Sequence, residues 1–436
     1  MIGRRGHTPI ERLSSADLVQ MASESSGAPM QVGAVLLLRS ATRTETAVRD
    51  ALAERIRAVP RLRQRLVAAP LGCGRPVWVD DPGFDIARHV RRVQCPAPGD
   101  EHALLGVAAG VVTDRLPRDR PLWAATVVAG LCGGDTAIVL VLHHVVADGI
   151  GGLAVLARLV DGAPPPPLSL FPAPAPTGGR LFLDALRARL GAAAHVAELR
   201  AAADELVPSS TRRLPRCSLN RPTGPRRVLA VARAELAAVH AVGQAHDATV
   251  NDVVLTAVAG ALSTVLEHRG EHADTIVVSV PISSRRDASA NQLGNQAGVM
   301  PVAVPATGDR LQRLKATGGL ARLRKTATPG SSAALLDPAF RILARMGALR
   351  WFINRQRLIN TFVTNLRGPA HGMTLLGAEI SAVIPVALIT GNVAVAFAVL
   401  SYSGDLVVTI VADPENCPDL PLLKGALQSE LDALTR

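Results

Sequence analysis

One segment predicts both a structural element and a group of reactive side chains: Ala137-Ile-Val-Leu-Val-Leu-His143-His144-Val-Val-Ala-Asp148-Gly149. The apolar run before the histidines predicts a strand that is buried on both faces. Two histidines close the strand, and a turn that holds an acid and a glycine follows it. The pattern therefore predicts that imidazole and carboxylate groups lie close together at the end of a rigid strand.

These histidines suit general-base chemistry. A general base must reach the acceptor hydroxyl, and its ring must be held in one orientation. Successive side chains of a strand point to opposite faces, so His143 and His144 cannot both face one cleft. One is the candidate base, and the other packs or orients. Asp148 and Gly149 close the loop, where Gly149 leaves room for substrate or backbone. These four residues are the candidate catalytic residues.

Three other interpretations of the segment are possible. Zinc is disfavoured because two histidines and an aspartate at this spacing do not converge, and the chain has no HExxH motif. Gly149-Ile-Gly151-Gly-Leu-Ala154 matches the pattern G-x-G-x-x-A of dinucleotide-binding loops. The acid expected about twenty residues further on is missing, since Asp161 comes too soon. Two core histidines beside a turn remain an open alternative on this segment alone.

Mixed α/β structure is predicted on both sides of a proline-rich middle. Apolar patterning predicts strands over residues 31–38, 125–129, 137–142, 227–231 and 275–280. Helical patterning predicts helices over residues 44–58, 103–116, 181–206 and 250–266. Thr249 or Asn251 is the expected cap of the last of these helices.

The 436 residues suit two domains. Prolines crowd residues 161–168 and 171–176, which predicts a stiff, extended linker. We expect an N-terminal domain at 1–160 that carries the histidine motif. A linker and connecting helix at 161–222 and a C-terminal domain at 223–436 complete the expected organisation.

Composition restricts the class of protein. Hydrophobic residues make up 48% and charged residues 19%, which is typical of a globular chain. The five cysteines are scattered without a CxxC pair, which favours a reducing compartment. The net charge of +11 allows nucleic acid, an anionic membrane surface or a polyanionic ligand. One tyrosine and 3% aromatic residues leave little for base stacking, so we expect no nucleic-acid partner.

Two segments bear on membranes. Residues 380–404 carry no formal charge, but Pro385 and the turn at Thr390-Gly391-Asn392 split them into two predicted strands. Together with the polar N-terminus, this predicts a cytoplasmic protein without a signal peptide or a span. Residues 340–359 are basic and apolar, and either dock on an anionic membrane or pack on the core. Their predicted stripe is Ile342, Met346, Leu349 and Ile353, bordered by Arg341, Arg345, Arg350, Arg355 and Arg357.

The pattern His-His-x-x-x-Asp-Gly resembles the signature of the coenzyme A-dependent acyltransferase superfamily. The chain resembles, almost from end to end, the bacterial wax ester synthase/diacylglycerol acyltransferase family within it. The segments that carry this resemblance are Arg12-Leu-Ser-Ser-Ala-Asp17, Pro29-Met-Gln-Val-Gly33, Arg75-Pro-Val-Trp-Val-Asp-Asp-Pro-Gly-Phe-Asp85 with His89-Val90, Arg120-Pro121-Leu122-Trp123, Val250-Asn251-Asp252-Val253, Val280-Pro281-Ile-Ser-Ser-Arg285, Gly294-Asn295, Thr364-Asn365-Leu-Arg-Gly368-Pro369 and Leu400-Ser-Tyr-Ser-Gly404.

This resemblance implies an α/β fold of two chloramphenicol-acetyltransferase-like domains with a substrate tunnel at their interface. It implies that His144 deprotonates an acceptor hydroxyl, and that the alkoxide attacks the thioester of a long-chain acyl-CoA. The expected acceptor is diacylglycerol, which gives triacylglycerol, or a long-chain fatty alcohol, which gives a wax ester. Acyl-CoA is a substrate, so no cofactor is expected. The absence of G-x-S-x-G agrees with a route that needs no acyl-enzyme.

The resemblance also implies supporting residues. Asp148 is expected in an ion pair with Arg285, although a turn-capping role for Asp148 stays open. The remaining supporting candidates are Asn251, Asp252, Gly294, Asn295, Pro121, Leu122 and Trp123. Asn251 and Asn295 could donate to substrate or cap local structure, and Pro121 to Trp123 favour packing. The chain departs from the family at Ala124, where an acid is usual, and at Arg286.

Two alternative functions stay open at this point. One is an enzyme of the same fold with a different acceptor, of the amide-forming condensation type. The other is a non-catalytic lipid-binding relative. For the leading function, we expect peripheral association with the inner face of the plasma membrane or with lipid inclusions such as droplets.

Overall fold

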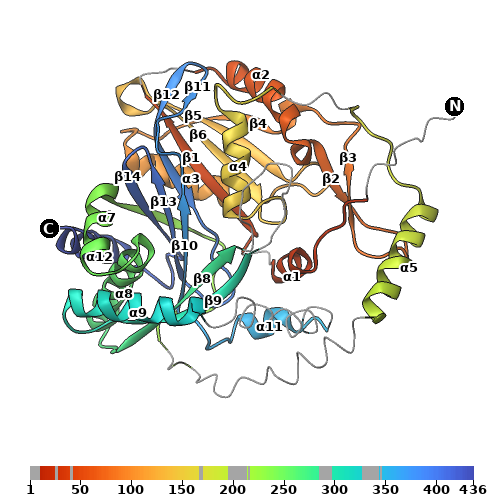
Figure 1. Cartoon of the computed structure of the whole chain (residues 1–436). Coiled ribbons are helices and arrows are strands. Elements are labelled where there is room, and N and C mark those ends of the chain that lie inside the picture. The colour runs from red at the N-terminus through yellow and green to blue at the C-terminus, as the bar shows by residue number, and fades with distance from the viewer. Residues whose placement is uncertain are drawn as a thin grey trace.

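The protein is built on two six-stranded sheets that face each other (Figure 1). The structure is a computed structural model that describes residues 10–24, 28–39, 43–165, 170–194, 214, 217–283, 297–326, 343 and 346–436.

The first sheet has the order β11-β12-β1-β6-β5-β4. Its strands are β1 (Gln31–Leu38), β4 (Val90–Gln94), β5 (Trp123–Ala129), β6 (Thr136–His143), β11 (Thr374–Leu375) and β12 (Ala378–Val386). Every residue of β6 is buried, as expected for an apolar strand inside a sheet. Helices α1 (Ser15–Ser23), α2 (Glu45–Arg55), α3 (Glu101–Thr113) and α4 (Gly149–Leu159) accompany this sheet.

The second sheet has the order β7-β14-β13-β10-β8-β9. Its strands are β7 (Val228–Glu235), β8 (Thr275–Ser283), β9 (Ala297–Pro305), β10 (Thr361–Arg367), β13 (Val395–Tyr402) and β14 (Asp405–Ala412). Its helices are α7 (Leu236–Ala245), α8 (Val250–His268), α9 (Arg310–Thr326), α12 (Leu420–Leu434) and the short α11 (Leu349–Ile353). Helix α8 is almost wholly buried against this sheet.

The chain crosses between the two sheets near its C-terminal end. Strand β12 pairs antiparallel with β1, with Ile384 opposite Val35, although it follows β10 of the second sheet in the sequence. The strand after it, β13, returns to the second sheet between β10 and β14. This exchange ties the two halves through backbone hydrogen bonds. The expected boundaries at 160 and 223 stay predictions.

Short elements complete the fold. A two-stranded sheet pairs β2 (Gln64–Val67) with β3 (Val77–Asp80), and α5 (Gly178–Ala194) lies beside it, away from the second sheet (Figure 1). The 3₁₀ turns are η1 (Ile56–Ala58), η2 (Pro60–Arg63), η3 (Ile86–Arg88) and η4 (Cys132–Gly134).

The predicted elements are confirmed where the structure describes them. Residues 380–404 form β12 and β13 with a turn between them, and Gly391 in that turn has a positive φ of 64°. Thr249 caps α8 in a capping box with Asp252, so Asn251 is not the cap. The expected helix at 181–206 is described only as far as Ala194.

Membrane-spanning potential is restricted to one described helix. Helix α8 is long and apolar enough to span a bilayer, but 78% of its apolar window is buried inside the protein. The basic stripe expected at 340–359 is described in part. Leu349 is buried while Met346 is exposed, and Ile342, Arg341 and Arg345 lie outside the described residues.

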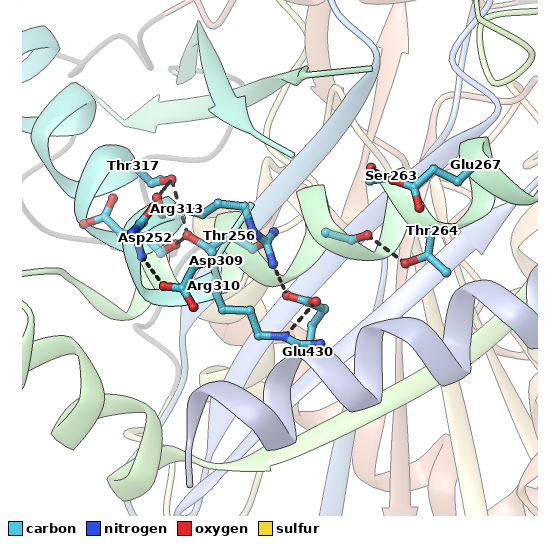
Figure 2. Close-up of polar contacts among 12 residues, drawn as sticks. Asp252, Thr256, Ser263, Thr264, Glu267, Asp309, Arg310, Arg313, Thr317 and Glu430 are labelled. Carbon is cyan, nitrogen blue, oxygen red and sulfur yellow. Dashed lines mark hydrogen bonds and ion pairs between the residues drawn. The ribbon is translucent and has the colours of Figure 1, made fainter. Parts of the chain in front are cut away.

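A charged cluster joins α8, α9 and α12, in which Arg313 and Glu430 are buried and Arg310 is half-exposed (Figure 2). Arg313 donates to Glu430 at 2.6 Å, and Arg310 donates to the other carboxylate oxygen at 3.0 Å. Arg313 also donates to the backbone carbonyl of Thr256. Gly260 makes this arrangement possible, because a Cβ there would lie 2.6 Å from a guanidinium nitrogen of Arg313. We define Arg310, Arg313 and Glu430 as the α9–α12 cluster.

Candidate functional site

Strand β6 places the two histidines on opposite sides, as the alternation of side chains requires. His143 is buried and faces away from the space between the sheets, whereas His144 lines that space. The backbone of both is held by hydrogen bonds. His143 N donates to Leu122 O at 3.0 Å, and His144 N donates to Met30 O at 2.7 Å. The backbone from which the ring of His144 projects is therefore held in place.

Asp148 and Gly149 begin α4 directly after the histidines. Asp148 is the N-cap residue, and its Oδ1 accepts a hydrogen bond from Gly151 N at 2.8 Å. Asp148 is only 5% exposed and also lines the space that His144 faces. The cap thus fixes a carboxylate near the imidazole.

Gly149 allows the two halves of the molecule to meet closely. A Cβ at this position would lie 2.9 Å from Cδ2 of Leu366 on β10. Real side chains do not approach so closely, so only glycine fits without a shift of Leu366. Gly149 is the point where the start of α4 meets the second sheet.

A cavity of about 350 Å³ lies between the two sheets beside these residues. One wall comes from β1, β6 and β12, and the facing wall comes from β8, β10 and β13. Apolar side chains dominate it, including Leu140, Leu142, Phe362 and Leu400. Such a lining suits an aliphatic chain.

Burial controls the charge of His144. Desolvation lowers the pKa of its imidazole to about 4, and the nearby carboxylate of Asp148 opposes this only in part. The ring is consequently neutral at pH 7. Among the described residues its Nδ1 finds no hydrogen bond of good geometry, although its own carbonyl lies near enough to raise the pKa slightly. A neutral, desolvated imidazole on the wall of an apolar cavity can accept a proton.

His143 has a different environment. Its Nδ1 accepts a hydrogen bond from Val145 N at 3.2 Å, so its Nε2 carries the proton in the neutral ring. That Nε2 lies 3.7 Å from the carboxylate of Glu24, which is an ion-pair distance and not a hydrogen bond. The side chain of His143 therefore points toward Glu24 and away from the cavity.

Glu24 was missed in the sequence because it lies far from the motif. Its side chain is only 7% exposed at the end of α1, and Arg118 pairs with it. Burial raises the pKa of Glu24, but His143 and Arg118 outweigh this and leave it below its ordinary value. The residues next to Glu24 in the sequence carry no pattern that predicts a buried acid.

The segment Pro121-Leu122-Trp123 supports the site by packing. Trp123 is buried, donates from Nε1 to Leu62 O at 2.7 Å, and stacks on His89 with ring centroids 4.6 Å apart. Leu122 offers the carbonyl that holds His143. Pro121 accepts a backbone hydrogen bond from Trp123. None of the three lines the cavity.

In the C-terminal half, Asn365 lines the cavity, whereas the expected residues Asn251 and Asp252 do not. Asn365 lines the cavity and donates to Oδ1 of Asn251 at 3.4 Å, so Asn251 supports a lining residue without lining the cavity itself. Asp252 is buried, and its Oδ2 accepts from both the backbone and the hydroxyl of Thr249. This places Asp252 in a helix cap.

Three expected residues and one departure fall outside the described part of the chain: Arg285, Gly294, Asn295 and Arg286. The ion pair of Asp148 with Arg285 thus stays a prediction. Within the described residues, no group of three or more His, Cys, Asp and Glu side chains could hold a metal ion.

Comparison with protein families gives two matches along the chain. Residues 13–254 match the wax ester synthase/diacylglycerol acyltransferase catalytic domain. Residues 293–435 match the C-terminal domain of the same family.

Similar curated proteins come from mycobacteria. A probable diacylglycerol O-acyltransferase of Mycobacterium tuberculosis is 30% identical over 93% of this chain and 91% of its own length. A second such protein from that organism is 37% identical over 62% of this chain and 61% of its own.

Solved structures share the fold over nearly the whole chain. The wax ester synthase/diacylglycerol acyltransferase of Marinobacter aquaeolei has a TM-score of 0.71 and 23% identity, and the match covers 97% of this chain and 98% of that one. The first condensation domain of the CDA synthetase has a TM-score of 0.61 and 17% identity, covering 98% and 96%. A starter condensation domain of rhizomide synthetase, solved with C8-CoA and Leu-SNAC, has a TM-score of 0.61 and 14% identity, covering 98% and 94%.

Proposed function

Because this chain belongs to the wax ester synthase/diacylglycerol acyltransferase family, and is an acyltransferase of that type, we propose a specific reaction for it. It moves a long-chain acyl group from acyl-CoA to the hydroxyl of diacylglycerol or of a long-chain alcohol. His144 is the general base of this reaction. The observation that carries the assignment is a neutral, desolvated and partly buried imidazole on the wall of an apolar cavity.

The chemistry balances without a cofactor. His144 takes the proton of the acceptor hydroxyl, and the oxygen attacks the thioester carbonyl carbon. The tetrahedral intermediate collapses with cleavage of the carbon–sulfur bond, and the protonated imidazole returns its proton to the leaving thiolate. The products are an ester and free coenzyme A. An unperturbed pKa would leave part of the imidazole protonated at neutral pH, and the lowered pKa keeps the base free.

Asp148 acts as a positioning residue in this proposal. Its cap on α4 fixes the carboxylate, and its charge favours the imidazolium that forms during the reaction. An ion pair with Arg285 would hold that carboxylate further. His143, held by Leu122 and facing Glu24, fixes the end of β6 from the opposite side.

The substrate class rests on the cavity and the family. The cavity walls are apolar and come from both sheets, which suits a long acyl chain better than a charged one. Solved neighbours of this fold include a condensation domain bound to C8-CoA, an acyl thioester of the same kind. Because the acceptors and the product are lipids, we also propose that the enzyme works at the cytoplasmic surface of the plasma membrane or of lipid inclusions.

The test is a turnover assay on the purified full chain. Long-chain acyl-CoA is offered with diacylglycerol, with a long-chain alcohol and with a primary amine in separate reactions. Release of free thiol together with triacylglycerol or wax ester supports the proposal. Thiol release only with the amine would overturn it in favour of condensation-type chemistry, and no thiol release with any acceptor would overturn it altogether.

A further inference from the structure

Helix α5 carries an apolar face that is exposed in the described part of the chain. Leu181 is buried against Cys73 and Val77, and Ala185, one turn further along the helix, is buried near Gly74. The large apolar side chains on the remaining surface of the helix are exposed: Phe182 is 47%, Leu183 51%, Leu186 39% and Leu190 64% exposed.

These exposed side chains form one stripe. Residues 182, 186 and 190 follow each other at intervals of four, and residue 183 lies beside them on the same side. At 3.6 residues per turn this stripe lies roughly opposite Leu181 and Ala185. The helix therefore has two apolar faces, and among the described residues only one of them is packed against the rest of the protein.

A second element extends the stripe. Leu71, in the turn between β2 and β3, is fully exposed, at 104% of its reference area. Arg189 of α5 donates to the carbonyl of the adjacent Gly72 at 3.1 Å, which places this turn against α5. Five of the nine large apolar side chains exposed in the described part of the chain thus gather here. Scattered exposed leucines are ordinary, but a contiguous group indicates a binding surface.

The charge around the stripe is positive. Arg189 and Arg187 lie on its two sides, and α5 has one acid, Asp184, which pairs with Arg12 at 2.6 Å. An apolar stripe between arginines is complementary to a bilayer with anionic headgroups, where the leucines enter the acyl region and the guanidinium groups meet phosphate. A protein partner would need no such cationic border.

We propose that Leu71, Phe182, Leu183, Leu186 and Leu190, with Arg187 and Arg189, form a surface that docks on an anionic phospholipid bilayer. We call it the α5 surface. The inference deepens the proposed function, because an acyltransferase with membrane-dissolved acceptors needs contact with lipid. It names a different surface from the basic segment at 340–359.

The α5 surface is connected to the cavity. Arg12 donates to Asp184 and to the carbonyls of Leu181 and Cys73, so it joins α5, the β2–β3 turn and the residues just before α1. Helix α1 in turn supplies Val19 and Gln20 to the cavity wall. A bilayer bound at α5 would therefore lie on the side of the molecule next to that wall.

The test is co-sedimentation of the full chain with vesicles of phosphatidylcholine, with and without phosphatidylglycerol. Wild type should bind the anionic vesicles, and added salt should weaken binding. Combined Leu71→Ser, Phe182→Ser and Leu190→Ser should reduce partitioning by about tenfold or more. Arg187→Gln should reduce it by about fivefold. The matched controls are Leu311→Ser, an exposed leucine on α9, and Arg92→Gln, an exposed arginine on β4; neither should change binding.

A second measurement separates this proposal from the proposed function. Turnover with detergent-dispersed substrates should be the same in wild type and the triple serine variant, which also shows that the variant folds. Wild-type sedimentation by the triple variant, or no sedimentation of wild type, would overturn docking while leaving the reaction untouched. A wild-type dimer that the triple variant converts to monomer would assign the surface to self-association and overturn the proposal. Vesicle binding without turnover would remove the reaction and leave docking in place.

Discussion

The site around His144 and the α9–α12 cluster both hold polar side chains that the fold has largely removed from water, but these side chains differ in their hydrogen bonding. In the cluster, Glu430 accepts one hydrogen bond from each of two arginines, so both of its carboxylate oxygens have a partner (Figure 2). At the site, the imidazole of His144 is neutral, and Nδ1 has no well-formed hydrogen bond among the described residues. The side chains of the cluster bind one another, whereas the imidazole of His144 faces a cavity.

The difference separates stability from function. A buried ion pair with its hydrogen bonds made resists disruption, because loss of one partner strands the other charge. A desolvated base whose Nδ1 has no well-formed hydrogen bond among the described residues adds little to the stability of the fold and is ready to receive a proton from outside. Removal of a residue from the cluster should therefore reduce stability, and removal of His144 should reduce activity.

The largest expected effect is on catalysis by His144→Ala. Loss of a positioned general base should lower kcat by about 10²–10⁴-fold, because nothing else that lines the cavity offers a neutral imidazole. Steady-state kinetics with acyl-CoA measures this, and thermal unfolding should show a Tm close to that of wild type. His143→Ala is the matched control, with a larger loss of Tm and a smaller loss of kcat. Equal turnover by folded His144→Ala and wild type would remove His144 as the base.

The next effect is on stability, from Glu430→Gln in the α9–α12 cluster. The side chain of Arg313 is only 5% exposed, and it would lose its charged partner. We expect destabilisation of about 3 kcal/mol, with kcat unchanged below the unfolding transition because the cluster does not line the cavity. Denaturant titration measures it. Glu267→Gln, an exposed acid on α8, should change stability by less than about 0.5 kcal/mol. A comparable loss of stability in both variants would show that the pair of Arg313 and Glu430 stabilises the fold no more than an exposed acid does.

A smaller effect is expected at Gly149, where the start of α4 meets β10. Gly149→Ala brings a Cβ to 2.9 Å from Leu366, which must shift inside the cavity wall. We expect a loss of about 1–3 kcal/mol and a raised KM, since overpacking displaces a lining side chain. Gly152→Ala on the same helix is the control, because its Cβ would meet nothing within 4 Å. If Gly149→Ala is as stable and as active as Gly152→Ala, the close approach of α4 and β10 does not matter.

The smallest effect is a shift on the pH axis. Because the pKa of His144 is lowered to about 4, the base stays neutral down to acid pH, and kcat/KM should keep its plateau below pH 6.5. The unfolded chain binds the proton first, so this group costs stability as the pH falls from 6.5 to about 4 and no further below that. A pH profile of kcat/KM and of Tm tests both. An acid limb centred at 6.5 would mean that the imidazole is solvated in the working enzyme.

Local patterns predicted the elements that hold the site. The apolar run before His143 predicted β6, and the alternation of strand side chains predicted that His143 and His144 face apart, as they do. The breaks at Pro385 and Gly391 predicted that residues 380–404 form two strands. Residue type restricted the cap of α8 to Thr249 or Asn251, and the structure shows that it is Thr249.

By itself, the sequence determined the strand, the histidine pair and the capped turn, because these depend on neighbours a few residues away. Only the tertiary structure decided what surrounds them. Glu24 lies beside His143, and Leu366 lies against Gly149, through contacts between residues more than a hundred positions apart. The crossing of β12 and the wall of the cavity depend on the same long-range packing, which no local period encodes. Likewise, a helical pattern shows that α5 has apolar residues, but only the fold shows that one face is covered and the other is left exposed.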